Sequence, residues 1–155
     1  MKKKLLFLTL LLIGVLTFTM SACGDDDDDL LPEKVPAGIK ETFNTMFPSV
    51  IAKWERERGL YKAEFFNGMG KDVDVYFKAD GTWVRTVTDV YPLELPQVVK
   101  DYVAANYAGW YIDDADWVET PEGNYYLLEL DREGQAEIYR RITEDGEVLD
   151  GVALK

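Results

Sequence analysis

The segment VPAGIKETFNTMF at residues 35–47 has a counterpart 60 residues later, LPQVVKDYVAANY at residues 95–107, and this pair decides the fold. Each segment begins with an apolar residue and a proline, whose fixed φ angle favours the first turn of a helix. The apolar residues that follow fall on one helical face. They are Ile39, Phe43, Met46 and Phe47 in the first segment and Val99, Tyr102, Val103 and Tyr107 in the second. We therefore predict two amphipathic helices, each packed through this stripe.

The sequence after each predicted helix has the pattern of antiparallel strands joined by tight turns. The expected strands are residues 50–57, 60–66, 72–78 and 82–90, and then residues 110–119, 124–131, 135–143 and 147–154. Glycine turns separate them, among them Asp80-Gly81 and Asp145-Gly146. One helix with a four-stranded meander buries little apolar surface by itself. We therefore predict an α+β fold of tandem helix-plus-four-strand repeats, whose strands form one antiparallel sheet with both helices on one face. Two loosely tethered units are the alternative.

This body is expected to span residues 35–155, with halves at 35–92 and 93–155. The second half is slightly longer, and we place its extra residues in its first strand and in a bulge near residues 139–141. The chain is 47% apolar with 13% aromatic residues, which is enough apolar surface for a folded domain.

Alternation along the strands predicts which side chains face away from the helices. Leu128 and Leu130 are expected in the core, and Tyr125 and Leu127 on the opposite, open side of the sheet. Exposed aromatic and apolar side chains tend to mark interaction sites. The predicted ligand-binding residues are Phe66, Tyr76, Trp83, Tyr125, Leu127 and Tyr139.

The residue inventory excludes several kinds of chemistry. The formal net charge is -12, and such an acidic chain repels nucleic acid, so no nucleic-acid partner is expected. The sequence has no histidine, its one cysteine is Cys23, and Ser49 is its only serine beyond residue 22. Thiolate or imidazole metal sites, histidine-assisted triads and internal disulfides are therefore ruled out for the body. No metal and no cofactor are predicted.

An enzyme with this inventory would have to use carboxylates, lysine, tyrosine or backbone groups. Two acids about 5 to 10 Å apart could hydrolyse a glycoside, but no pair stands out among 29 acids, so we predict that the chain is not an enzyme. The run Asp113-Asp114-Ala115-Asp116 lacks the glycine and the distal glutamate of an EF-hand and is more typical of a solvated turn.

The first residues have the pattern of a secretory signal. Three lysines, Lys2 to Lys4, precede an apolar stretch shorter than the roughly 20 residues of a membrane-spanning helix. Met20-Ser21-Ala22-Cys23 closes it and resembles the lipobox of bacterial lipoproteins. Residues 1–22 are therefore predicted to be a signal peptide, and Cys23 the lipidation site that anchors the chain to a membrane. A cleaved but unlipidated secreted protein is the alternative.

Residues 23–34 are expected to form an acidic tether. Five consecutive aspartates, Asp25 to Asp29, repel one another and favour a solvated chain over a calcium site. An acidic run directly after the lipidated cysteine resembles a surface-export signal of some Gram-negative lipoproteins. The resemblance implies an outer-membrane, surface-exposed protein, and a periplasm-facing anchor is the alternative.

The helix-plus-meander layout, the Leu95-Pro96 helix start, the two Asp-Gly turns and the lipobox together resemble the PepSY-like family, also called beta-lactamase-inhibitor-protein-like. The resemblance covers residue 35 to the C-terminus. It implies a curved sheet whose open face binds a protein or peptide, with a non-catalytic role. Alternatives are a regulator or inhibitor of an envelope enzyme and a glycan-binding lipoprotein.

Overall fold

The computed structural model describes residues 28–149, so the predicted signal peptide, Cys23 and residues 150–155 lie outside the described residues. The described chain is an α+β fold with one antiparallel sheet of eight strands, in which spatial order follows chain order. The strands are β1 (Asp28–Leu30), β2 (Lys53–Glu57), β3 (Leu60–Phe66), β4 (Asp72–Phe77), β5 (Trp83–Asp89), β6 (Tyr111–Thr120), β7 (Gly123–Asp131) and β8 (Ile138–Ile142). The helices are α1 (Ala37–Met46) and α2 (Gln97–Asn106), and two short 3-10 turns precede them, η1 (Pro32–Lys34) and η2 (Pro92–Glu94).

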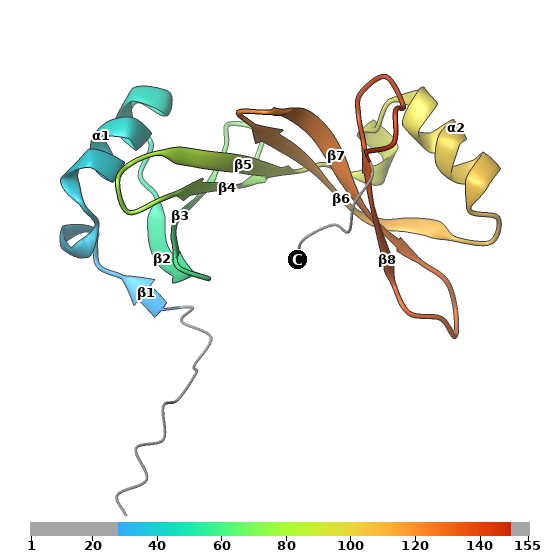
Figure 1. The fold of residues 1–155 in the computed structure, drawn as a ribbon, viewed down its shortest axis with the longest axis horizontal. Helices are drawn as coiled ribbons and strands as arrows, with labels where there is room; N and C mark the ends of the chain where they lie inside the picture. Colours follow the sequence, from blue (N-terminus) through green and yellow to red (C-terminus); the bar gives the residue numbers. More distant parts are fainter. Residues whose placement is uncertain (1–27, 150–155) are drawn as a thin grey trace, which may run out of the picture.

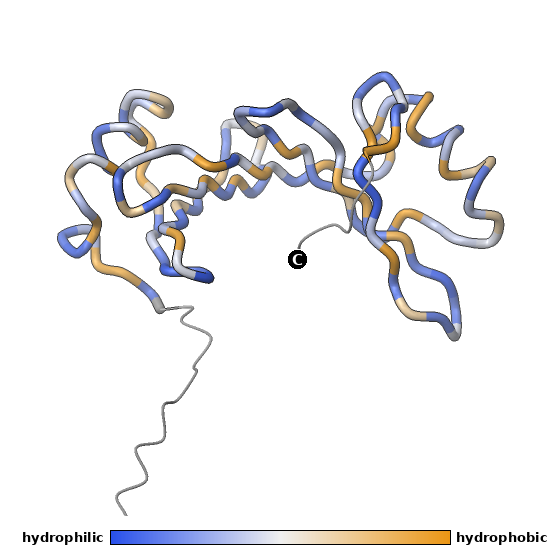
Figure 2. The backbone as a smooth tube through the Cα atoms, in the orientation of Figure 1, coloured by the Kyte–Doolittle hydropathy of each residue, from blue (hydrophilic) through white to orange (hydrophobic). Residues whose placement is uncertain are grey.

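The sheet bends into an arch, and both helices lie on its outer, convex side, one near each end (Figure 1). The predicted α+β fold with both helices on one face is therefore confirmed. The concave side carries no helix, and we call it the open face. Alternating hydrophobic and hydrophilic residues along β4 and β5 separate the two faces (Figure 2).

The core of the first half is an aromatic cluster beneath α1. Phe43 of this helix is 2% exposed, and its ring meets Trp54, Phe65 and Phe77 edge-on at centroid distances of 5.3, 5.9 and 6.5 Å. Edge-to-face contacts of this kind are favoured by the charge distribution of aromatic rings. Ile39, one turn earlier, is fully buried in the same cluster. Ile39, Phe43 and Phe47 of the predicted stripe therefore anchor α1 to the sheet, whereas Met46 at the end of the helix is exposed, and its predicted place in the packed stripe is wrong.

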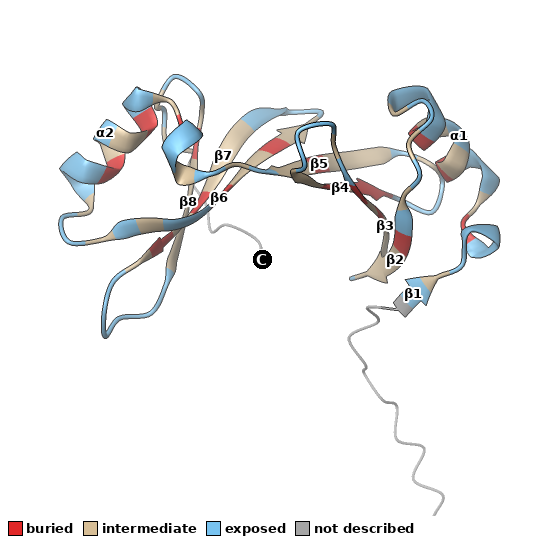
Figure 3. Ribbon diagram, turned by 180° about the vertical axis from the view of Figure 1, so that it is seen from behind, coloured by how far each residue is buried: buried red, intermediate tan, exposed pale blue. Residues whose placement is uncertain are grey.

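The second half has its own, mainly aliphatic core. Val99 and Val103 of α2 pack with Leu128, Leu130 and Ile142. No buried residue belongs to both clusters among the described residues. Figure 3 shows the buried positions under the two helices. The two clusters are joined mainly by the β5–β6 ladder, which pairs residues 86–89 with residues 116–119.

Each of the two Asp-Gly turns packs against the start of one helix. Gly81 has a φ of +89°, and a Cβ built on it would lie 3.2 Å from the carbonyl carbon of Gly38 in α1. Gly146 has a φ of +86°, and a Cβ there would lie 2.7 Å from Cγ2 of Val98 in α2. At both sites φ is positive and a Cβ would crowd the neighbouring helix, which favours glycine in the two halves.

The structure differs from the sequence expectations in several strands. Strand β1 pairs with β2, so residues 28–30 belong to the sheet and not to a solvated tether; Leu30 packs against the first core. The run from Asp113 to Asp116 lies in β6 and not in a turn, because Ala115 is buried in the second core. The extra residues of the second half lengthen β6, which bulges between Ile112 and Asp114. The register between β7 and β8 is regular, so the bulge predicted near residues 139–141 is wrong.

The end of the second half is only partly described. After β8, the structure shows an isolated bridge from Ile142 to Val148. Val148 lies in the segment expected to form the eighth strand of the two repeats, residues 147–154. The remainder of that predicted strand lies outside the described residues.

Candidate functional site

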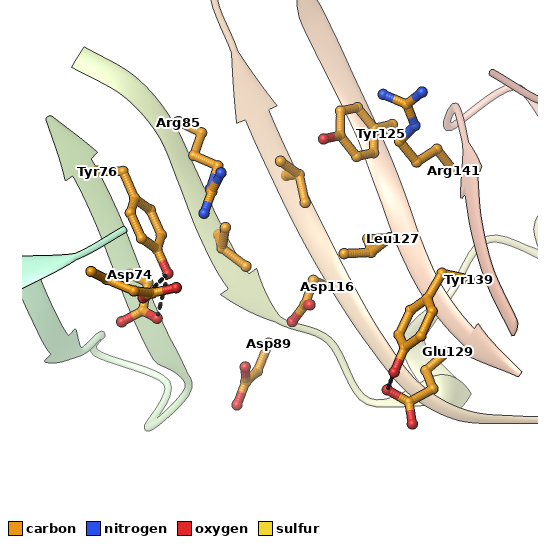
Figure 4. Close-up of a pocket in the computed structure, with 13 residues that line it drawn as sticks. Asp74, Tyr76, Arg85, Asp89, Asp116, Tyr125, Leu127, Glu129, Tyr139 and Arg141 are labelled. Atoms are coloured by element: carbon orange, nitrogen blue, oxygen red, sulfur yellow. Dashed lines mark hydrogen bonds between the residues drawn. The ribbon is translucent and has the colours of Figure 1, made fainter. Parts of the chain in front are cut away.

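The sheet register assembles a hollow on the open face from strands of both halves. One row across the sheet is Asp74, Val87, Val118 and Tyr125; the next is Asp89, Asp116, Leu127 and Arg141. Residues paired across neighbouring strands point to the same face, so these side chains share one surface. With Glu57, Tyr76, Arg85, Glu129 and Tyr139 they line a hollow of about 360 Å³ (Figure 4). This size is within the range of small ligand sites.

One end of the hollow is built around Tyr76. Tyr76 is 6% exposed, and the guanidinium of Arg85 lies 3.9 Å from its ring centroid. Its hydroxyl donates to Oε2 of Glu57 at 3.0 Å and approaches Oδ2 of Asp74 at 3.4 Å. Burial, followed by the charges of Asp74 and Glu57, raises the pKa of Tyr76. Tyr76 therefore stays neutral, and its ring forms one rigid side of the hollow.

The other end carries two further tyrosines. The guanidinium of Arg141 lies 5.6 Å from the centroid of the Tyr125 ring, within the range of a cation–π contact. The hydroxyl of Tyr139 donates to Oε2 of Glu129 at 2.7 Å. Figure 4 shows Leu127 between these groups and the centre of the hollow. This end is thus aromatic, half-buried and partly cationic.

The centre of the hollow holds two facing carboxylates. Asp89 of β5 is the direct partner of Asp116 of β6. Burial, and then the negative charges of Asp114 and Asp89, raises the pKa of Asp116 to about 7. Burial also raises the pKa of Asp89, with the charges of Asp72 and Asp114 adding to the effect. Near neutral pH the two side chains together therefore carry less negative charge than two fully ionised carboxylates.

Lys62 of β3 organises the acids at the Tyr76 end. Its Nζ lies 2.9 Å from Oε2 of Glu55, 3.3 Å from Oε2 of Glu64 and 3.7 Å from Oδ2 of Asp74. Burial opposes the charge on Lys62, but the hydrogen bond to Glu55 and the charge of Asp74 outweigh it and raise the lysine pKa. Burial raises the pKa of Asp74 to about 6, although Lys62 opposes the shift. Lys62 therefore offsets part of the negative charge at this end.

The predicted binding residues divide into three groups: four that line the hollow, Phe66 outside it, and Trp83 on the helix side of the sheet. Tyr76, Tyr125, Leu127 and Tyr139 all line the hollow, so the structure brings together side chains from both halves. Phe66 lies at the end of β3, paired with Asp72 and 70% exposed, but it does not line the hollow.

Trp83 does not lie on the open face, and its predicted place there is wrong. It packs against the core under α1, and its Nε1 donates to Oγ1 of Thr86 at 3.1 Å. The register of β4 and β5 shifts between Tyr76 and Phe77, so that Trp83 pairs with the buried Phe77. The bulge thus turns Trp83 to the helix side.

The charged residues of the hollow were not singled out from the sequence. Arg85, Asp89, Asp116 and Arg141 belong to strands with the expected alternation, but alternation alone does not bring β5 opposite β6. The sequence does carry one signal for the open-face residues of β5, the alternation in Arg85-Thr86-Val87-Thr88-Asp89, in which every second residue faces the open side. Only the register identifies their neighbours.

The described residues do not support two other kinds of site. Within residues 28–149 no group of three or more His, Cys, Asp or Glu side chains could hold a metal ion. In the same range no helix is long and apolar enough to cross a membrane.

Comparison with known families identifies the class. The family described as "Putative beta-lactamase-inhibitor-like, PepSY-like" matches residues 25–78 and 59–149, which is most of the chain. The chain therefore belongs to this PepSY-like family, as the sequence resemblance predicted. No curated protein matches it significantly.

Solved structures with the same fold come from Bacteroides species. A DUF2874 family protein from Bacteroides ovatus is 28% identical, with a TM-score of 0.67 over 74% of this chain and 84% of that chain. A protein from Bacteroides eggerthii described as "putative periplasmic" is 26% identical, with a TM-score of 0.66 over 75% and 86%. A BLIP-like protein from Bacteroides fragilis is 22% identical, with a TM-score of 0.67 over 78% and 86%, and shows the fold alone.

Proposed function

We propose that this protein is a non-catalytic binding module of the cell envelope that captures a protein or peptide on its open face. The observation that carries the proposal is the hollow, which combines tyrosines from both halves on the sheet side that no helix covers. Tyrosine offers a large contact area with few rotatable bonds, and such residues dominate binding energy at protein interfaces. The beta-lactamase-inhibitor-like description of the family agrees with this class of function.

Site-specific photo-crosslinking in the source cells tests this proposal. A photoreactive amino acid at Tyr125 should capture a discrete partner, whereas the same group at Ala104, exposed on α2, should not. Capture of one partner equally from both positions, or from Ala104 alone, would place the binding surface elsewhere and refute the assignment.

The purified partner then gives the affinity of the face. Replacing Tyr125 and Leu127 together by alanine should weaken binding about tenfold or more, because both are half-buried and neither belongs to a core cluster. Tyr76 is a poor choice for this test, since its ring is buried and its hydroxyl is bonded to Glu57. Circular dichroism should show an unchanged fold for the double variant.

A second candidate, favoured by the family description, is regulation or inhibition of an envelope enzyme. It predicts that the crosslinked partner is an enzyme whose activity falls when purified residues 28–155 are added. If the partner of Tyr125 proves to be a glycan instead, the glycan-binding alternative replaces both.

We also propose that Cys23 carries a lipid and that the protein sits on the outer membrane with its body exposed at the cell surface. The lipobox-like Met20-Ser21-Ala22-Cys23 and the aspartates after it support this location. Cys23→Ala should move the protein out of the membrane fraction. Protease added to intact cells should digest the native protein, and full protection until the outer membrane is ruptured would favour the periplasm-facing alternative.

A further inference from the structure

The floor of the hollow is apolar at its centre. Val87 and Val118 are direct partners on β5 and β6, and Val118 is only 2% exposed. Leu127 stands beside Asp116 in the next row. An apolar floor bordered by carboxylates suits a side chain that has both a hydrocarbon stem and a charged end.

Within the described residues the charge of this centre is only partly offset, because burial and the neighbouring acids raise the pKa of Asp89 while Lys71 opposes the shift. Among residues 28–149, neither Asp89 nor Asp116 accepts a hydrogen bond or forms an ion pair, and like charges directly opposite on a sheet are destabilising. By contrast, Asp74 has Lys62 within 3.7 Å, and Glu129 accepts a hydrogen bond from Tyr139. The unfavourable pair therefore lies in the hollow, where a partner on the open face can reach it.

The two arginines of the hollow lie toward its ends. Arg85 stacks on Tyr76, and Arg141 lies over Tyr125 (Figure 4). They leave a central anionic position between two aromatic ends. A partner complementary to this pattern brings positive charge to the centre and apolar or aromatic contacts to the sides.

We propose that the centre of the hollow takes an arginine or lysine side chain from a protein partner, with its stem on Val87, Val118 and Leu127 and its cationic end against Asp89 and Asp116. This inference rests on the proposed binding function of the open face and names the chemistry of the partner. The charge complementarity favours a basic segment over an acidic or neutral one.

A pair of synthetic peptides tests the inference directly. The probes are acetylated, amidated Ala-Tyr-Arg-Tyr-Ala and the same peptide with citrulline, a neutral isostere of arginine. Titration followed through the methyl NMR signals of Leu127 gives both dissociation constants. The arginine peptide should bind about tenfold more tightly than the citrulline peptide, because only arginine brings a charge to the two carboxylates.

Matched variants separate the central pair from general attraction to an acidic protein. In Asp89→Asn/Asp116→Asn the preference for arginine should fall below about threefold. In Glu41→Gln/Glu133→Gln, which makes the same charge change at two exposed sites away from the hollow, it should remain. Equal binding of the two peptides to the native protein, no binding of either, or equal losses in both variants would each overturn the inference.

The partner captured through Tyr125 provides the separate readout for the proposed function. If that partner binds the Asp89→Asn/Asp116→Asn variant as tightly as the native protein, the binding function stands and the basic side chain is refuted. If the binding face itself is wrong, Tyr125 captures no specific partner, whatever the peptides do.

Discussion

Replacing Asp116 by asparagine should make the protein more stable at alkaline pH and remove the part of its pH dependence that comes from this carboxyl. The native pKa of about 7 lies well above the ordinary value of 3.8 that this carboxyl regains on unfolding. Between these values the folded protein binds more protons than the unfolded chain, so its stability falls as the pH rises. The groups that face Asp116 act in the same direction: Asp74, Asp89, Asp114 and Glu129 are all acidic.

The magnitude follows from the displacement of the pKa. At 1.36 kcal/mol per pH unit, the full shift corresponds to about 4 kcal/mol. Asp116 is only partly buried, and solvent screening reduces this to about 1–2 kcal/mol. Asp116→Asn should therefore raise the free energy of unfolding by about 1–2 kcal/mol near pH 8 and change it little near pH 4.

Urea denaturation at about pH 4, 6 and 8 measures this effect. Glu41→Gln, an exposed substitution on α1, controls for the change in net charge. If the native protein gains stability from pH 4 to pH 8 while Asp116→Asn follows it in parallel, Asp116 is not a strained carboxyl and the reasoning fails.

Two further substitutions test the packing of the helices. Phe43→Ala should lower the free energy of unfolding by about 3–5 kcal/mol, because it empties the centre of the aromatic cluster. Met46→Ala, on the exposed end of α1, should lower it by less than about 1 kcal/mol. Equal losses in the two variants would contradict the described core. Gly146→Ala should destabilise more than Gly134→Ala, because both glycines have a positive φ but only the first would push a Cβ against Val98. Thermal unfolding of the two variants side by side gives the comparison, and identical midpoints would show that this contact relaxes freely.

The helices and the two faces of the sheet followed from local sequence patterns. Helical spacing placed Ile39 and Phe43 in the core because burial of one face is the main source of helix stability in a small domain. Alternation separated Leu128 and Leu130 from Tyr125 and Leu127 because successive strand residues point to opposite sides.

What could not be predicted depends on register and on long-range pairing. A shift of one position at the end of β4 moved Trp83 to the helix side, and the sequence carries no mark of that bulge. Nothing in the sequence pairs Asp89 with Asp116 among 29 acids, and only the β5–β6 ladder places them opposite each other. At the start of the described chain, the self-repulsion of Asp28 and Asp29 was overestimated, because pairing of β1 with β2 and partial burial of Leu30 outweigh it.

The strict sequential order of the strands has a consequence for how the chain acquires its shape. Every ladder joins neighbours in the sequence, so no strand has to wait for a distant segment before it can pair. The aromatic core beneath α1 is complete once β5 has been made, and the later strands then add to an existing edge. Such a protein can fold progressively from its N-terminal end, with its two halves maturing one after the other.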